Sequence, residues 1–320
     1  ASFRCGNNPG MVGKLDYRGI LKTPDAHAEV FKELTDSLKT SQVTEADFSS
    51  CGIGPVALGY LSEWVREATA VVNCLTLDMN GIFGELYSSG NVMEADKFAG
   101  DCDAFLAALK GSNIVTLSLQ KTGIGPVTLQ KLATSLPAAV ARLILNENPL
   151  TGGIWDSDFD TDITGVTALC DTLKTLSVTE LGLAKCRLGP GSLAKLAEYV
   201  REATAAVARL SLSGNAITGS KSHYIGLTEV WEYDVDLSGL ILLCDALLTL
   251  KNPIELDLSN CGLSVNGVIP IAKAISAGAA LTSINCLANQ FGDDDLATLL
   301  TADRKSTRLN SSHRCISYAV

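Results

Sequence analysis

Apolar and polar residues follow a two-part pattern that recurs along the whole chain. In one copy, Leu181 and Leu183 flank a single glycine, and the stretch Leu193–Val200 (LAKLAEYV) then places apolar residues three or four positions apart. Strict alternation predicts a half-buried strand, whereas a period near 3.6 predicts an amphipathic helix. Each unit is therefore predicted to be a strand, a turn and a helix.

The pattern V-x-x-L-x-L-x-x-N/C-x-L aligns eight copies, and we expect a ninth, degenerate copy to begin near Val12. The eight begin at Val43, Val72, Ile114, Val140, Val178, Val207, Pro253 and Leu281. Successive starts lie 29, 42, 26, 38, 29, 46 and 28 residues apart, so units near 28 residues alternate with longer ones. Glu63–Leu77 and Glu198–Leu212 are nearly identical, which indicates that a four-repeat block was duplicated.

A single strand–turn–helix unit cannot bury both its strand and its apolar helix stripe, so such units must stack. The prediction is an α/β solenoid, a horseshoe of about eight or nine repeats, with a parallel sheet on the concave face and helices on the convex face. We expect one continuous array over residues 1–302.

One loop position after each strand holds a small polar residue or a cysteine. The eight residues are Cys51, Asn80, Thr122, Asn148, Cys186, Asn215, Cys261 and Asn289. A side chain there can bond the buried backbone of the neighbouring loop. With the helices that follow, this arrangement resembles the ribonuclease-inhibitor type of leucine-rich repeat over about Val12–Leu300.

The longer repeats carry insertions between the strand loop and the helix, at Gly84–Gly100, Gly152–Gly165 and Gly219–Gly239. Aromatic and acidic residues alternate in them, and loops on a rigid scaffold commonly carry recognition residues. We predict partner binding by Tyr87, Phe98, Trp155, Asp156, Asp158, Phe159, Asp160, Tyr224, Trp231, Glu232, Tyr233 and Asp234. The alternative is that these aromatics pack onto their own repeats.

Small and polar residues on the strands predict a second, acidic surface on the concave face. They are Asp47, Ser49, Thr76, Asp78, Ser118, Gln120, Ser211, Ser213, Asp257 and Ser259. The segment Asp156–Asp162 (DSDFDTD) also resembles the start of a calcium loop, but Thr161 stands where that loop needs glycine and Thr167 where it needs glutamate. We favour a solvated acidic loop and expect neither metal nor cofactor.

Most of the ten cysteines occupy repeated positions, which predicts buried thiols in a reducing compartment. Cys102, Cys170 and Cys244 stand near the starts of helices in the longer repeats, and the sequence has no C-x-x-C pair. His27 and His223 have no Ser or Cys nucleophile near them in sequence. We therefore expect no catalytic residues.

The formal net charge of −10 argues against nucleic acid as a partner and favours a basic protein. Asp303–His313 (DRKSTRLNSSH) and Ile316–Val320 (ISYAV) resemble translated sequencing-adapter DNA, so we expect residues 303–320 to be non-native. Without them, 21 basic residues stand against 34 acidic ones, a net charge of −13. The sequence has no uncharged apolar run of about 18 residues, so membrane insertion is not expected.

Together these features predict a non-catalytic scaffold for protein–protein interaction, in the cytoplasm and of undetermined oligomeric state. Two roles follow from resemblance and stay open. Similarity to ribonuclease inhibitor implies capture of a basic enzyme, and similarity to Ran GTPase-activating protein implies regulation of a GTPase. A leucine-rich-repeat sensor attached to a nucleotide-binding domain is a third alternative.

Overall fold

The computed structural model describes residues 1–153, 158–204, 207–225, 227–292, 294, 297–299, 301 and 316–317. This part of the chain divides into two compact units. Unit 1 comprises Ala1–Leu150 with Leu176–Val178, and unit 2 comprises Thr151–Thr175 with Thr179–Val320. Of the tail resembling adapter DNA, only Ile316–Ser317 lies within the described residues.

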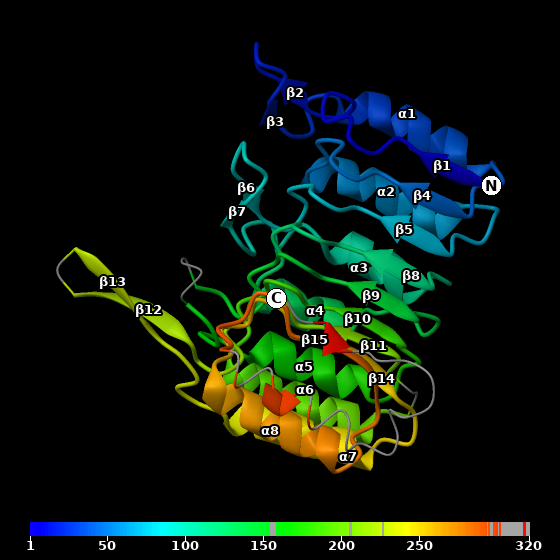
Figure 1. Ribbon diagram of the computed structural model, residues 1–320. Helices are drawn as coiled ribbons and strands as arrows, with labels where there is room; N and C mark the ends of the chain where they lie inside the picture. Colours follow the sequence, from blue (N-terminus) through cyan, green and yellow to red (C-terminus); the bar gives the residue numbers. More distant parts are fainter. Residues whose placement is uncertain are drawn as a thin grey trace. The chain divides into compact units, whose positions relative to one another are not determined.

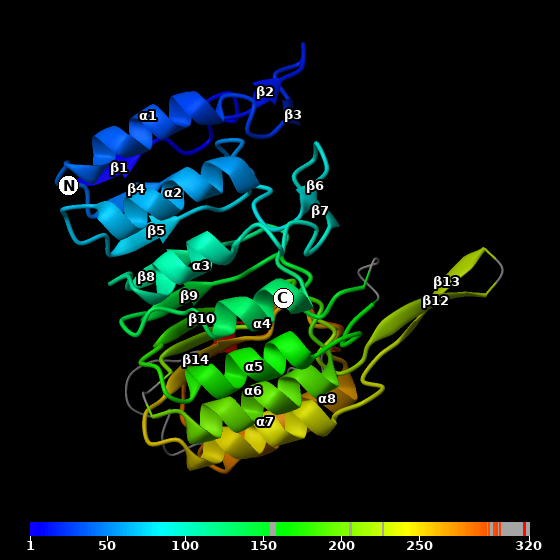
Figure 2. The ribbon, with the colours of Figure 1, turned by 180° about the vertical axis from the view of Figure 1, so that it is seen from behind.

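Unit 1 alternates strands with helices. Its parallel sheet has the order β1 (Ser2–Arg4), β4 (Glu45–Asp47), β5 (Cys74–Thr76), β8 (Thr116–Ser118) and β9 (Arg142–Ile144). Its helices are α1 (Ala28–Lys39), α2 (Pro55–Glu67), α3 (Asp103–Lys110) and α4 (Pro126–Ala133). Two antiparallel hairpins interrupt the alternation, β2 (Lys14–Leu15) with β3 (Leu21–Thr23), and β6 (Glu85–Leu86) with β7 (Val92–Glu94). The strands form one face and the helices the other (Figures 1 and 2).

Unit 2 repeats this arrangement. Its parallel strands are β10 (Glu180–Gly182), β11 (Arg209–Ser211), β14 (Ile254–Asp257), β15 (Leu281–Asn285) and β16 (Ile316–Ser317). Its helices are α5 (Thr164–Leu173), α6 (Pro190–Glu202), α7 (Ser238–Thr249) and α8 (Val265–Ser276). A longer hairpin, β12 (Lys221–Ile225) with β13 (Thr228–Glu232), projects away from the helices of the unit (Figure 1). Both units are α/β stacks of strand–turn–helix repeats, as predicted.

The central residue of each strand explains why leucine recurs. Leu75, Leu117 and Leu143 are paired in register across unit 1 and are fully buried. Leu210 and Leu256 occupy the same row in unit 2. Because each fully buried leucine is worth roughly 1.5–3 kcal/mol, this row accounts for much of the stability of the stack.

Asparagine side chains satisfy the backbone of the buried loops. Asn80 Oδ1 accepts hydrogen bonds from the amides of Cys51 (3.0 Å) and Ile53 (3.1 Å). Asn80 Nδ2 donates to the carbonyls of Phe48 (2.8 Å) and Leu77 (3.0 Å). Asn148, Asn215 and Asn289 make the corresponding bonds to the loops of Thr122, Cys186 and Cys261. The predicted role of this loop position is thus observed.

The first copy begins earlier than the position near Val12 where we expected it. Its strand is β1, and the register of β1 with β4 places Asn8 at the loop position that Cys51 occupies in the next copy. This copy departs from the pattern, with Phe3 and Cys5 at the two leucine positions, as the next copy does with Ala46 and Phe48. Asparagine at this position precedes every long unit in the array, and cysteine or threonine precedes every short one.

Among the described helices, none is both long enough and apolar enough to cross a lipid bilayer.

Candidate protein-binding site

An aspartate at the end of each insertion caps a helix of the following repeat. Asp96 Oδ1 accepts hydrogen bonds from the amides of Gly125 (2.9 Å) and Thr128 (2.9 Å), and Oδ2 accepts one from Val127 (2.8 Å). These amides begin α4 and have no partner within the helix. A carboxylate is favoured here because it accepts these bonds and complements the positive end of the helix dipole.

The same capping recurs three more times. Asp25 caps α2, Asp160 caps α6 and Asp234 caps α8, from 29 to 33 residues earlier in the chain. All four aspartates have positive φ, between 51° and 60°. The residue at the helix N-cap supplies no side-chain bond of its own in α2, α4, α6 or α8. Each insertion is therefore fastened to the next repeat through its last residues.

Glycine at the start of α4 permits this close approach. A Cβ atom on Gly125 would lie 2.5 Å from Asp96 Oδ2, closer than real Cβ contacts occur. Gly54, which begins α2, meets Asp25 in the same way. The glycines of the GIGP segments thus leave room for the capping carboxylate as well as shaping a turn.

This geometry changes how two predicted partner-binding residues are interpreted. Asp160 and Asp234 bond the first amides of α6 and α8, and Asp234 is 9% exposed. We assign both a structural role and leave them out of the proposed contact surface. The sequence alone did not indicate this capping role, because each aspartate lies about 30 residues from the helix amides that it accepts hydrogen bonds from.

The segment that resembles a calcium loop also supplies helix caps. Asp160 caps α6, and Asp162 Oδ1 accepts bonds from the amide (2.9 Å) and hydroxyl (2.7 Å) of Thr164 at the start of α5. The hydroxyl and amide of Thr164 lower the pKa of Asp162. Within the described residues, no group of three or more His, Cys, Asp or Glu side chains could hold a metal ion.

The two hairpins of unit 1 present exposed tyrosines. Tyr17, in the β2–β3 turn, is 88% exposed, and Tyr87, next to β6, is 55% exposed. Both hairpins lie at the same end of their helices, in both views of the molecule (Figures 1 and 2). The first hairpin was not predicted, although a repeated set of residues marks it. Gly13, Leu15, Gly19 and Asp25 recur 71 residues later at Gly84, Leu86, Gly90 and Asp96.

The hairpin of unit 2 carries two exposed aromatic side chains. Tyr224 and Trp231 are 71% and 50% exposed, and Leu227, at the tip, is fully exposed. Ser222 pairs with Trp231 and Tyr224 pairs with Glu229, so these four side chains share one face. Trp231 stacks on Tyr233, with 5.8 Å between the ring centroids and an angle of 8° between the ring planes. The hairpin, which projects from the unit, thus carries two exposed aromatic rings on one face, and one of them stacks on a third ring.

The other predicted contact residues differ in accessibility, and two of them are not described. Phe98, Phe159 and Tyr233 are half-buried, and a Cβ atom on Gly189 would lie 2.5 Å from Phe159 Cδ2, so Phe159 packs against the start of α6. Asp158 is half-buried and Glu232 is exposed. Trp155 and Asp156 lie outside the described residues.

Polar side chains on the strands bond to one another. Ser118 Oγ donates to Asp78 Oδ1 (2.7 Å), and Gln120 Nε2 donates to Glu147 Oε1 (2.8 Å). Burial raises the pKa of Asp78. In unit 2, Arg209 forms an ion pair with Glu255 on the neighbouring strand (2.7 Å). The strand face therefore carries mixed charges that partly compensate each other, and not acids alone.

The buried cysteines have the environment of inert thiols. Burial raises the pKa of Cys170, Cys244, Cys261 and Cys286 to about 12. Because the thiolate is the reactive form, these side chains pack as small apolar groups at neutral pH. Cys5 and Cys51 lie at the N-terminal edge of unit 1 with their sulfurs 3.9 Å apart.

No family model matches the chain. Among curated proteins, it is similar to the human protein named NACHT, LRR and PYD domains-containing protein 13, with 27% identity over 145 residues. The match covers 42% of this chain and 14% of that protein. With the stacked strand–turn–helix units and their asparagine ladder, this similarity supports a leucine-rich-repeat fold.

Proposed function

We propose that this chain is a protein-binding scaffold without catalytic residues, and that its inserted hairpins make the principal contacts. The observation that carries the proposal is the aromatic face of the β12–β13 hairpin, where Tyr224 and Trp231 are held exposed on a paired element. Aromatic side chains held on a rigid structural element commonly dominate the binding energy of protein interfaces. Similarity to a protein whose name includes LRR domains supports the same general role.

The hairpins are anchored in a way that suits recognition. Asp234 fastens the end of the β12–β13 insertion to α8, as Asp96 fastens the β6–β7 insertion to α4. An anchored loop loses less conformational entropy on binding than a free one. The chain's net charge of −10 favours a partner with a basic surface.

The test is a double substitution, Tyr224→Ala with Trp231→Ala, measured by titration against a partner identified by cross-linking at the hairpin. Loss of two aromatic anchors is expected to weaken binding by roughly 30-fold or more. The control is Val71→Ala, which removes a 60% exposed side chain from the loop between α2 and β5. Unchanged affinity in a folded double variant would refute hairpin recognition.

A further inference from the structure

One inter-helix groove in unit 2 lacks the aromatic side chain that α2 and α6 carry at the equivalent position. Helices α2, α6 and α8 can be aligned through their N-cap residues, which are Gly54, Gly189 and Ser264. The tenth residue after the cap is Trp64 in α2, Tyr199 in α6 and Ala274 in α8. Trp64 and Tyr199 are fully buried aromatic side chains. In α8, the same position holds only a methyl group.

An ion pair closes the equivalent grooves on the outside. Lys39, the last residue of α1, lies 3.1 Å from Glu67 at the end of α2. Lys174, directly after α5, lies 3.1 Å from Glu202 at the end of α6. In both cases the lysine follows the last buried leucine of its helix, and the glutamate is the thirteenth residue after the N-cap.

Both members of that ion pair are replaced between α7 and α8. Leu248 stands at the lysine position and Ala277 at the glutamate position. The internal aromatic and the external ion pair are thus both missing between α7 and α8, and they are also missing at α4, where Ser135 and Ala138 are the tenth and thirteenth residues after the N-cap Gly125. The two departures differ, because α4 ends before the position of the aromatic residue whereas α8 continues past it.

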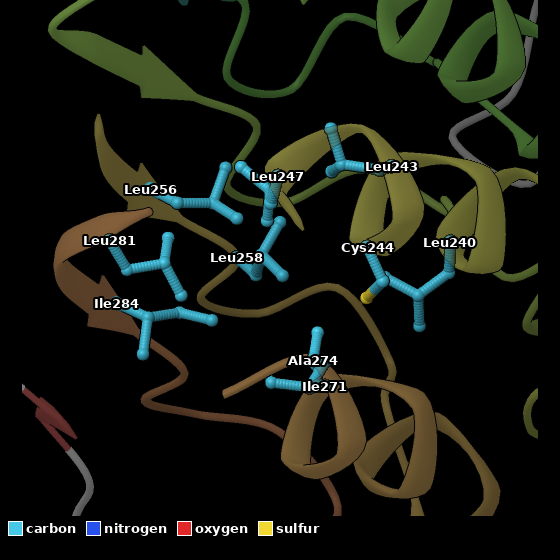
Figure 3. Close-up of a pocket in the computed structure, with 10 residues that line it drawn as sticks. All are labelled: Leu240, Leu243, Cys244, Leu247, Leu256, Leu258, Ile271, Ala274, Leu281 and Ile284. Atoms are coloured by element: carbon cyan, nitrogen blue, oxygen red, sulfur yellow. The ribbon is translucent and has the colours of Figure 1, made fainter. Parts of the chain in front are cut away.

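The opening is an apolar groove with a volume of about 390 Å³, here named the α7–α8 groove. Its walls are formed mainly by Leu237, Ile241 and Leu248 on one side and by Ile269, Pro270 and Ala277 on the other. Cys244 and Ala274 line it and also line a smaller cavity of about 10 Å³ beneath it. Figure 3 shows Ala274 and Ile271 of α8 facing Cys244 and Leu240 of α7 across that cavity.

The charges at the groove differ from those at the closed grooves. Asp245 of α7 and Lys273 of α8 line the groove. Neither side chain forms an ion pair with another described residue. Asp234 also lines it, but Oδ2 of that carboxylate is already bonded to the start of α8. An occupant with a ring between one acidic and one basic group would complement both the apolar walls and the unpaired charges.

We propose that the α7–α8 groove binds an aromatic side chain of a protein partner, on a segment with an acidic and a basic residue beside the ring. The ring takes the space that Trp64 and Tyr199 fill in the equivalent grooves. Removing a ring and the groove walls from water drives such binding, and concave apolar sites of this volume are typical of ligand pockets. This inference rests on the proposed protein-binding function in one respect, namely that the aromatic ring belongs to a protein partner.

Indole is the probe for the ring alone, titrated against the full chain and followed by ligand-observed NMR. Saturable binding is expected, with a dissociation constant on the order of 1 mM. Ile269→Asp places a carboxylate in the groove and is expected to weaken indole binding at least ~10-fold. The matched control is Val265→Asp on the same helix, because Val265 is 51% exposed, Ile269 is 57% exposed, and only Ile269 lines the groove.

Reciprocal substitutions test the equivalence between grooves. Ala274→Trp restores the side chain seen in α2 and is expected to abolish indole binding, whereas Trp64→Ala is expected to create a second indole site. If Ala274→Trp does not fold, Ile269→Asp carries the same test. Absence of saturable indole binding, binding of cyclohexanol in preference to indole, or equal effects of the two aspartate substitutions would overturn the proposal.

A blocked Glu-Trp-Lys tripeptide is expected to bind more tightly than blocked Ala-Trp-Ala, and equal affinities would remove the charged part of the proposal. Substituting both Tyr224 and Trp231 by alanine leaves the groove intact, so indole binding should persist in that variant. Failure of the hairpin proposal and failure of the groove proposal can therefore be told apart.

Discussion

At the scale of single residues, a few polar side chains satisfy the backbone of the whole stack. Asn80 is fully buried, and it bonds two amides and two carbonyls of adjacent loops. Leaving such groups buried without partners costs about 1–3 kcal/mol each, so one asparagine affects stability as much as a large core residue. Asn148, Asn215 and Asn289 likewise bond the loops that carry Thr122, Cys186 and Cys261.

Asn80→Ala is therefore expected to lower the free energy of unfolding by about 3 kcal/mol, measured by urea denaturation. Asn73→Ala serves as the control because Asn73 is exposed, and a change within about 0.5 kcal/mol is expected for it. Equal stability of the two variants would contradict the role assigned to the ladder.

The cap at the start of α5 predicts a dependence on pH. Because Thr164 lowers the pKa of Asp162 in the folded state, the ionised carboxylate stabilises the fold above the ordinary aspartate pKa. That contribution is lost as the pH falls through the depressed folded-state pKa.

Asp162→Ala is expected to melt at a lower temperature than the native chain. This difference should be largest at pH 6–8 and should shrink below about pH 4. Thr161→Ala, next to it and without a titratable group, provides the comparison. A difference that grows as the pH falls would have the wrong sign for this assignment.

At the scale of elements, the hairpins and the aspartates that anchor them have separate roles. No described side chain of β12 or β13 is buried, whereas Asp234, immediately after them, holds the start of α8. The hairpin can therefore vary without disturbing the core, provided that its anchor remains. This separation explains how insertions of different length fit between otherwise uniform repeats.

Replacing Ser222–Trp231 by Asn-Gly is expected to change the melting temperature by no more than about 2 °C, because the flanking residues Lys221 and Glu232 are paired and suit a two-residue turn. Adding Asp234→Ala to that replacement should cost about 1–2 kcal/mol, since a helix cap is lost. Circular dichroism melts of both variants check this. Equal melts would contradict the anchoring role of Asp234.

At the scale of the whole molecule, net charge and surface composition favour a basic partner. The strand face carries acids that are partly bonded or paired, as with Asp78 and the ion pair of Glu255 with Arg209. Long-range attraction then arises from the charge of −10 as a whole, and salt screens it.

Raising NaCl from about 0.1 M to about 1 M shortens the Debye length from about 10 Å to about 3 Å. Affinity for the hairpin partner is expected to fall by roughly 10-fold over this range, measured by titration. Indole, which is neutral, should bind equally well at both concentrations. A partner affinity that ignores salt would exclude a contribution from the acidic surface.

The sequence by itself determined the strand–turn–helix order, the loop positions of asparagine and cysteine, and the places of three insertions. Each depends on a pattern within one repeat, such as Leu181 and Leu183 before the helix at Leu193. Such local periodicity can be recognised from the order of residues alone. The first copy, with Phe3 and Cys5 at its two leucine positions, was not predicted at its observed place.

Only the tertiary structure decided which groups meet between repeats. Asp160 and Asp234 read as acidic loop residues in sequence, and stacking makes them caps for helices about 30 residues further on. Ala274 looks unremarkable in an apolar helix. Its small side chain leaves a groove open at the position that the buried rings of Trp64 and Tyr199 occupy in two other repeats. Contacts between consecutive repeats join residues far apart in sequence, so their meaning appears when the units are stacked.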